Sequence, residues 1–343
     1  MSTATLDAPA ATAPTTRGRK PFLDLVAERV VVLDGAMGSA LQEIELDLEK
    51  DWLGQENMSE VLNFSRPDVI ESIHRSFLEI GCDGVETNSF GGNTIVMAEA
   101  DMPDKAYEVS KLAAEIARRA CDGFETGERG RYVIGSIGPG TKLVSLGNCT
   151  WDEMEASYFE NVTGLIDGGA DVLLIETVQD LLQIKVALAA IERAFDDRGL
   201  TGAPADGGER LPIMVQLSMD LNAGQSMLMG SDSQTALAAL LPFEQIDVMG
   251  FNCATGPTEL TEHVRYVSEH WPRYTSCLPN AGLPIMVDGV SHFPLTPPDF
   301  AKGVKRFVDE FGLNIAGGCC GTKTEHIKAL IDALGDKGPL RDG

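Results

Sequence analysis

Short runs of apolar and β-branched residues recur along this chain, and segments with apolar residues at helical spacing lie between them. One such segment has apolar residues at positions 69, 70, 73, 77 and 78, and another at positions 112, 113, 116, 117 and 120, which is the spacing of one helix face. The apolar runs predict eight strands, at residues 30–33, 84–86, 132–135, 172–175, 213–217, 248–251, 274–277 and 313–316. Mostly apolar strands that alternate with helices are typical of a parallel sheet covered on both sides.

Eight evenly spaced β/α units favour a closed barrel over a doubly wound open sheet. We therefore predict one (β/α)8 TIM barrel over residues 21–335, with its chemistry at the C-terminal ends of the strands. Residues 1–20, rich in Ala, Thr and Pro, are predicted to be a disordered N-terminal tail, and residues 336–343 a C-terminal tail. Two irregular stretches, 46–63 and 198–210, predict an elaboration after the first strand and an exposed loop.

Composition narrows the class of protein. The chain has 343 residues, 43% of them hydrophobic, which is enough for a large core. Its seven cysteines are odd in number and scattered, so they do not indicate a disulfide framework, and we expect a reducing, cytoplasmic location. No secretory segment and no apolar stretch of about 20 residues is present, so no membrane association is expected. The net charge of −25 disfavours nucleic acid as a partner.

The cysteines are the most informative residues. Cys319 and Cys320 are adjacent in a glycine-rich turn directly after the eighth run, and Cys253 follows the sixth run after Asn252. Adjacent cysteines rarely bond to each other, because a disulfide has a specific geometry, but both can reach one soft cation. Three thiolates and one open position predict a zinc site of the catalytic kind. The alternative, that these cysteines are small buried apolar residues, accounts poorly for the trio.

Zinc held by three thiolates is a poor activator of water, because its shell is already electron-rich. A soft fourth ligand, the thiol of a substrate, suits it better, and coordination would lower the pKa of that thiol. The predicted reaction is therefore attack of a substrate sulfur on an electrophilic carbon.

Other strand ends offer groups that could hold the rest of such a substrate. Asp34 and Glu176 directly follow the first and fourth runs, where two carboxylates could bind an ammonium group. The first strand is followed by a turn whose backbone N–H groups could receive a carboxylate, formed by Gly35, Ala36, Met37 and Gly38. Asn280 is a candidate polar neighbour of the metal, although a purely turn-forming role in Pro-Asn-Ala-Gly is an equally good interpretation. An amino-acid thiol fits this set.

Seven segments in this order resemble the homocysteine S-methyltransferase family, and most closely the N-terminal homocysteine-binding module of cobalamin-dependent methionine synthase. The resemblance covers about residues 21–334, and the segments that carry it are 34–38, 66–70, 86–90, 176–178, 252–254, 279–284 and 317–322. Ser39 stands where many relatives carry Thr, so a hydroxyl is kept.

The resemblance implies a barrel whose Zn²⁺ is held by Cys253, Cys319 and Cys320, with the sulfur of homocysteine as fourth ligand. It implies that Asp34 and Glu176 recognise the amino group, and that Asn280 can occupy the open zinc position before substrate arrives. The implied product is methionine. The leading hypothesis for the donor is methylcobalamin carried by a separate corrinoid- or folate-binding protein, with 5-methyltetrahydrofolate as the ultimate methyl source.

Three alternatives remain at this point. The chain could use a small onium donor directly, such as betaine, a thetin or S-methylmethionine. It could methylate a thiol other than homocysteine, since the same groups would activate it. It could also be a non-catalytic zinc-binding subunit, although the presence of all three cysteines with Asp34 and Glu176 counts against that hypothesis.

Overall fold

The computed structural model describes residues 19–126, 130–221, 224–287 and 290–335. Eight parallel strands form one sheet in the order β1-β10-β7-β6-β5-β4-β3-β2. The bounds of its strands are Val31–Val32 (β1), Gly84–Glu86 (β2), Tyr132–Ile137 (β3), Val172–Val178 (β4), Ile213–Leu217 (β5), Val248–Asn252 (β6), Tyr274–Leu278 (β7) and Ile315–Ala316 (β10). A parallel bridge between Leu33 and Gly84 joins the first strand to the second. The sheet thus closes on itself, and the predicted (β/α)8 barrel is confirmed.

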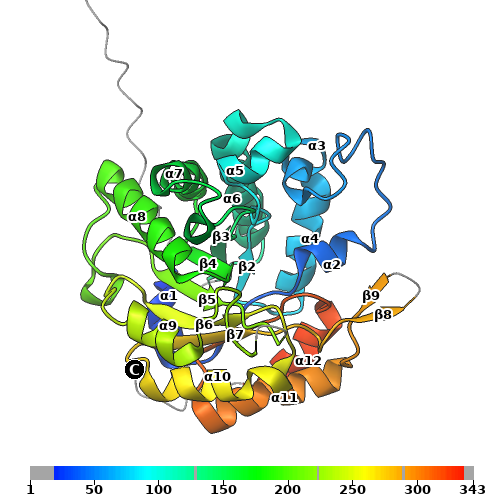
Figure 1. The fold of residues 1–343 in the computed structure, drawn as a ribbon. Coiled ribbons are helices and arrows are strands. Elements are labelled where there is room, and N and C mark those ends of the chain that lie inside the picture. The colour runs from blue at the N-terminus through cyan, green and yellow to red at the C-terminus, as the bar shows by residue number, and fades with distance from the viewer. Residues whose placement is uncertain (1–18, 127–129, 222–223, 288–289, 336–343) are drawn as a thin grey trace, which may run out of the picture.

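Helices surround the sheet (Figure 1). The longer ones are α4 (Pro67–Glu79), α6 (Ala106–Asp122), α7 (Trp151–Asp167), α8 (Leu181–Arg198), α9 (Ser233–Leu240), α10 (Pro257–His270), α11 (Pro297–Phe311) and α12 (Thr324–Leu334). Shorter ones are α1 (Phe22–Glu28), α2 (Met37–Leu41), α3 (Leu62–Ser65) and α5 (Thr94–Met97). No helix in the described ranges is long and apolar enough to cross a membrane.

Local sequence signals set where helices begin. Thr150 caps α7 in a reciprocal box with Glu153, in which the Glu153 N–H donates to Thr150 Oγ1 (3.2 Å) and Thr150 N–H donates to Glu153 Oε2 (2.8 Å). Pro67 occupies the first turn of α4, where its missing N–H costs nothing. The helix predicted from the apolar spacing at residues 69–78 is therefore confirmed.

Alternation along the strands divides the core into two regions. Residues that point away from the barrel axis pack against the surrounding helices, as Val85, Val133 and Leu173 do. The inward residues form a second cluster at the N-terminal end of the barrel. Its members include Leu33, Tyr132, Ile134, Val172, Leu174, Met214, Val248 and Ile315. Helix α1 closes this end, since Phe22, Leu23 and Val26 belong to the same cluster. Further along the strands the inward positions become polar, which prepares the opposite end for chemistry.

Polar residues just before alternate strands tie neighbouring strands together. The side chains of Asp83, Asp171, Asp247 and Asn314 accept the backbone N–H of Val32, Val133, Ile213 and Thr275, respectively, at 2.8–3.0 Å. The three aspartates also pair with arginines, for example Asp247 with Arg210 (2.7 Å). The contact recurs at every second strand, so the barrel has a structural repeat of two β/α units at its N-terminal end.

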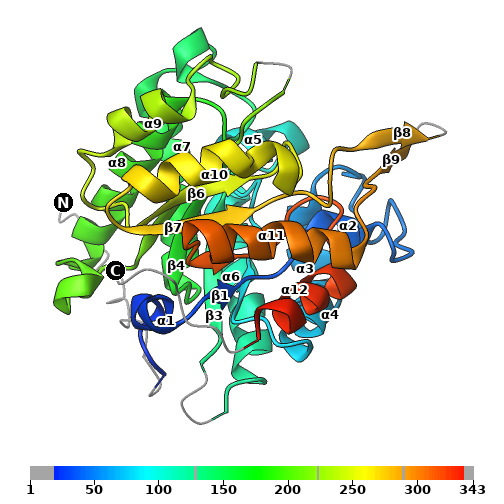
Figure 2. The same cartoon turned by 90° about the horizontal axis from the view of Figure 1, so that it is seen from below.

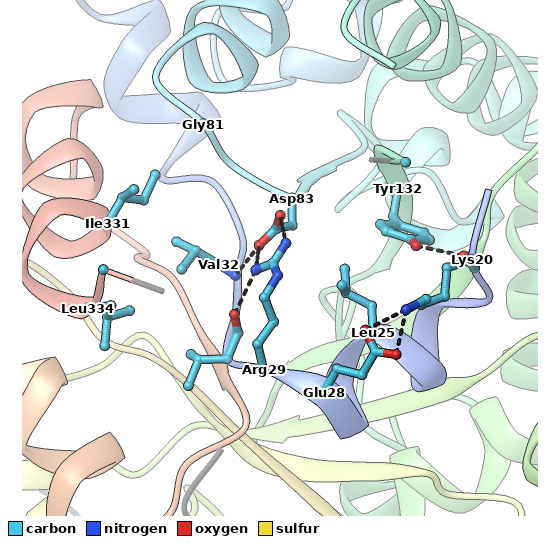
Figure 3. Close-up of a pocket in the computed structure, with 13 residues that line it drawn as sticks. Lys20, Leu25, Glu28, Arg29, Val32, Gly81, Asp83, Tyr132, Ile331 and Leu334 are labelled. Atoms are coloured by element: carbon cyan, nitrogen blue, oxygen red, sulfur yellow. Dashed lines mark hydrogen bonds and ion pairs between the residues drawn. The ribbon is translucent and has the colours of Figure 1, made fainter. Parts of the chain in front are cut away.

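A cavity of about 420 Å³ lies at this N-terminal end, between α1 and α12. Its charged groups pair with one another: Arg29 binds Asp83 (2.8 Å) and Lys20 binds Glu28 (Figure 3). Because these charges are already neutralised, and because the cysteines lie at the other end of the strands, the cavity has no part in the candidate site.

Two features differ from the sequence-based expectations. An antiparallel hairpin, β8 (Ile285–Val287) with β9 (Val290–His292), follows β7 and projects from the barrel (Figures 1 and 2). Arg19, assigned to the tail, is buried and pairs with Asp171 and Glu125, so the ordered fold begins earlier than residue 21. Most of the predicted N-terminal tail (1–18) and the C-terminal tail (336–343) lie outside the described residues.

Candidate metal centre

Three cysteines converge at the C-terminal ends of the strands. The sulfur atoms of Cys253, Cys319 and Cys320 all lie within 4.8 Å of one another, and Cys253 Sγ and Cys320 Sγ are 3.7 Å apart. Tetrahedral zinc with Zn–S bonds of about 2.3 Å requires sulfur atoms about 3.8 Å apart. All three side chains are only partly buried, so a further ligand can approach. The donor set and its spacing therefore fit a zinc ion.

Backbone hydrogen bonds hold the three cysteine-bearing loops together. The Cys253 N–H donates to Leu278 O (3.2 Å), the Cys319 N–H to Pro279 O (2.9 Å), and the Ala281 N–H to Cys320 O (3.0 Å). The loop after β7 thus lies between the other two and connects them. Ser39, in α2, accepts the N–H of Gly321 at its hydroxyl (2.9 Å), which gives the hydroxyl at this position a structural role.

The backbone is strained where it delivers the site residues. Cys253 and Ala254 both have positive φ (57° and 55°), as does Thr177 at the end of β4 (56°). Left-handed conformations are unfavourable for residues other than glycine, and they persist where the surrounding fold enforces them. At β4 the register to β5 also shifts between Ile175 and Val178, and such a bulge re-aims the side chains next to it.

Hydrogen bonds among the three cysteines shift the pKa values of their thiols in opposite directions. Hydrogen bonds from Cys253 and Cys319 lower the pKa of Cys320 to about 3. Hydrogen bonding to the other two thiols, together with burial, raises the pKa of Cys319 well above its usual value. The cluster therefore stabilises a thiolate, the form of cysteine that binds metal.

Glu176 is buried beside the cysteines and is well supplied with donors. Its carboxylate accepts hydrogen bonds from Ser136 Oγ (2.5 Å) and Asn252 Nδ2 (2.9 Å). Asn252 precedes Cys253 and also accepts the Thr177 N–H (2.8 Å), so one amide connects the cysteine loop to the end of β4. Burial raises the pKa of Glu176 to about 7.

Asp34 lies deep in the same end of the barrel, with 3% of its surface exposed. Its two carboxylate oxygens accept the backbone N–H of Glu86 (3.1 and 3.2 Å). Burial raises the pKa of Asp34 well above its usual value, and the Glu176 carboxylate raises it further. The structure therefore brings together the two carboxylates that the sequence suggested for an ammonium group.

The other predicted site residues lie around these groups. Gly35 packs against the double-cysteine turn, where a Cβ would come within 2.7 Å of Thr322 Oγ1. The Ala36 N–H donates weakly to Thr322 O (3.4 Å), and Met37 begins α2. Asn280 is buried with its Oδ1 unpartnered, and its N–H donates to Thr255 O; an orphaned side-chain oxygen beside the cysteine loops is more than a turn requires.

Sequence reasoning missed three residues that point into the barrel at the level of Asp34 and Glu176, which we call the carboxylate layer: Ser136, Asn252 and Glu86. Each lies at or near the end of its strand, β3, β6 and β2. Glu86 and Asn252 begin two of the segments that carry the family resemblance, but which strand residues point into the barrel can be recognised only once the alternation of each strand is known.

The chain is similar to known proteins over most of its length. Residues 31–334 match the family model of homocysteine S-methyltransferase. The chain is 43% identical over 313 residues to methionine synthase of Mycobacterium leprae (strain TN) and 42% identical to that of Mycobacterium tuberculosis (strain ATCC 25618 / H37Rv). Each alignment covers 91% of this chain and 25% of the relative, so the chain spans about a quarter of the length of the curated relatives it matches.

Solved structures support the fold. The homocysteine methyltransferase MmuM from Escherichia coli superposes with a TM-score of 0.68 at 19% identity in both its oxidized and its metallated form. The oxidized form matches over 91% of this chain and 97% of MmuM, and the metallated form over 90% and 98%. From the family match and the two relatives together, the chain belongs to the homocysteine S-methyltransferase family, a family of methyltransferases.

Proposed function

We propose that this chain transfers a methyl group to the sulfur of homocysteine, giving methionine, and that it does so with zinc. The observation that carries the proposal is the convergence of three cysteine sulfurs within 4.8 Å, beside a buried carboxylate that Asn252 connects to the same loop. Zinc bound by Cys253, Cys319 and Cys320 would lower the pKa of a fourth, substrate thiol and keep it as a nucleophilic thiolate.

The residues around the cysteines would bind and orient the amino acid. Glu176 and Asp34 face the substrate's ammonium group as anions or hydrogen-bond acceptors, and Ser136 and Asn252 hold the Glu176 carboxylate in place. Backbone N–H groups at the start of α2 would receive the substrate carboxylate, as helix and loop N–H groups do for anions. Two anchored ends fix the direction of the thiol, which is the main contribution of positioning to a displacement reaction.

For the methyl donor we propose methylcobalamin carried by a separate corrinoid-binding protein or domain. The new bond joins the methyl carbon to sulfur, and the electron pair of the broken cobalt–carbon bond stays on cobalt. The surface around the cysteines supports a large donor. Ten of the eleven exposed large hydrophobic residues in the described ranges lie in connections that follow strands at this end: Leu48, Leu53, Phe90, Leu146, Trp151, Leu228, Met229, Leu283, Ile285 and Met286.

We call these ten residues the apolar rim. Exposed apolar side chains concentrated in the connections at one end of a barrel suit a protein-binding surface, whereas a small onium donor needs only a pocket. The rim therefore favours a protein-bound donor over betaine, a thetin or S-methylmethionine.

A donor comparison tests the proposal. Zinc-loaded protein with homocysteine is supplied with methylcobalamin, betaine or S-methylmethionine, and methionine is quantified. Turnover with methylcobalamin alone is expected. Turnover with an onium compound would replace the proposed donor, and the absence of methionine with every donor would favour the non-catalytic alternative. Cys319→Ser is the matched negative control, since it is expected to lose zinc and turnover but keep the barrel's circular dichroism; turnover by the metal-free variant would overturn the zinc mechanism.

A further inference from the structure

Glu86 ends strand β2 and has no role in the function proposed above. Gly84 and Glu86 are in register with Tyr132 and Ile134 of β3, and both of these belong to the cluster inside the barrel. Because neighbouring residues in register share a face of the sheet, Glu86 points into the barrel. It lies at the polar level near the C-terminal strand ends, on the same face as Ser136 and Glu176. The residue is only partly buried.

The Glu86 carboxylate is the least satisfied of the three in this layer. Its Oε1 is buried and accepts no hydrogen bond. By contrast, Glu176 accepts from Ser136 and Asn252, and Asp34 accepts from the Glu86 backbone. A buried acceptor without a donor is costly, and its persistence indicates a partner that arrives with a ligand.

The charge of the layer points to the same conclusion. Glu176 and Asp34 are the charged groups that act on Glu86, and both raise its pKa in addition to the effect of burial. None of the salt bridges within the described ranges includes any of the three carboxylates. Carboxylates that are this close need a compensating cation, and the site as proposed provides one in the ammonium group of an amino acid.

Building on the proposed function, we propose that Glu86 is a third carboxylate contact for the substrate's ammonium group. An ammonium group has three N–H donors, and Asp34, Glu86 and Glu176 supply three acceptors from β1, β2 and β4. Glu86 thereby makes the amine a condition for tight binding, so the site selects amino-acid thiols over thiols that carry only a carboxylate.

The test compares homocysteine with 4-mercaptobutyrate, which has the same carbon chain, thiol and carboxylate but no amine. Both are titrated into cobalt(II)-substituted protein, and the thiolate-to-cobalt charge-transfer absorption reports binding without turnover. The wild type is expected to prefer homocysteine, and Glu86→Gln to reduce that preference roughly 10- to 100-fold, which is typical for losing a hydrogen bond to a charged group. Binding of 4-mercaptobutyrate should stay nearly constant.

Two further variants separate recognition from folding. Glu86→Asp keeps the charge but places it one methylene farther from the ammonium group. Its preference for homocysteine over 4-mercaptobutyrate should therefore fall between those of the wild type and Glu86→Gln. Glu60→Gln removes another buried carboxylate, one that already accepts the Gly91 N–H (2.6 Å), and should leave the preference unchanged. An unaltered preference in both Glu86 variants would overturn the inference while leaving the proposed function intact. Failure of wild-type protein to bind homocysteine at cobalt would overturn both.

Discussion

At the scale of single residues, the site is organised around Glu176, whose carboxylate accepts hydrogen bonds from Ser136, Asn252 and Thr177 before any ligand binds. Ser136 in β3 and Asn252 in β6 donate from the two sides of β4, the strand that carries Glu176. We predict that Glu176→Gln weakens homocysteine binding about 10- to 100-fold, because the amide removes the negative charge that faces the ammonium group. Zinc affinity should hardly change. Calorimetric titration with homocysteine and competition with a chromogenic chelator measure the two quantities separately.

A matched control distinguishes charge from packing at this position. Ser136→Ala removes one donor to Glu176 but leaves its charge, so it should affect homocysteine binding less than Glu176→Gln does. If Glu176→Gln bound homocysteine as tightly as the wild type, the carboxylate would have no part in recognising the amine.

His74 in α4 illustrates a residue whose ionisation affects stability instead of function. It is fully buried with both ring nitrogens unpartnered, and burial lowers its pKa to about 3. The folded protein keeps His74 neutral, whereas the unfolded chain protonates it below about pH 6.5. Its contribution to stability is therefore present above that pH and is lost as the pH falls.

We predict that wild-type protein loses about 2 kcal/mol of unfolding free energy more than His74→Leu does between pH 7 and pH 5, at about 1.4 kcal/mol per pH unit below pH 6.5. Urea unfolding of both proteins at the two pH values measures the difference. Parallel pH dependence in the two proteins would show that His74 stays neutral in both states or finds a partner when folded.

At the scale of secondary-structure elements, the N-terminal ends of the strands are held by the Asp or Asn that precedes every second strand. Asp247 carries both a hydrogen bond to Ile213 N–H (2.8 Å) and a largely buried ion pair with Arg210, whereas Asn314 makes the equivalent backbone contact without a charge. We predict that Asp247→Ala costs about 3–5 kcal/mol of stability, because it leaves the largely buried Arg210 without its counter-charge and the Ile213 N–H without its acceptor. Asp247→Asn should cost about 1–2 kcal/mol less, since it retains the backbone contact.

Denaturant unfolding of the two variants decides between these contributions. Equal losses would mean that the ion pair alone matters at Asp247. A negligible loss in both would show that the two-unit repeat is incidental to the stability of the barrel.

Elements that leave a local signal in the sequence could be predicted, whereas features that depend on contacts between distant segments could not. All eight barrel strands were predicted from the sequence, because buried parallel strands are continuous apolar runs that leave a local signal. The β8–β9 hairpin was missed, since Ile285 and Met286 are exposed and the segment lies in what looks like a connection. The cysteine trio was identifiable because its residue types are rare and specific. Glu86 and Asn252 were not, because their inward direction depends on register across strands far apart in sequence.

At the scale of the whole molecule, the two ends of the barrel have opposite characters. The N-terminal end is closed by α1 and by paired charges around Arg29, Asp83 and Asp171. The C-terminal end is open at the cysteines and bordered by the apolar rim. Leu241, which follows α9, is the one exposed large hydrophobic residue of the described ranges outside the rim. Such an asymmetry is expected if one end serves stability and the other meets a partner.

The rim therefore provides a comparison that separates docking from chemistry. Leu146 and Leu228 are rim residues with 59% and 52% of their surface exposed, and Leu241 is 42% exposed at the other end. We predict that Leu146→Glu and Leu228→Glu each lower kcat/KM about tenfold with a methylcobalamin-loaded corrinoid protein, as truncation of a central interface contact does, while rates with free methylcobalamin stay the same. Leu241→Glu should change neither rate, because it introduces the same charge far from the site. Equal losses with free and protein-bound donor would place the effect in the active site, and no loss in either rim variant would mean that the donor approaches without using this surface.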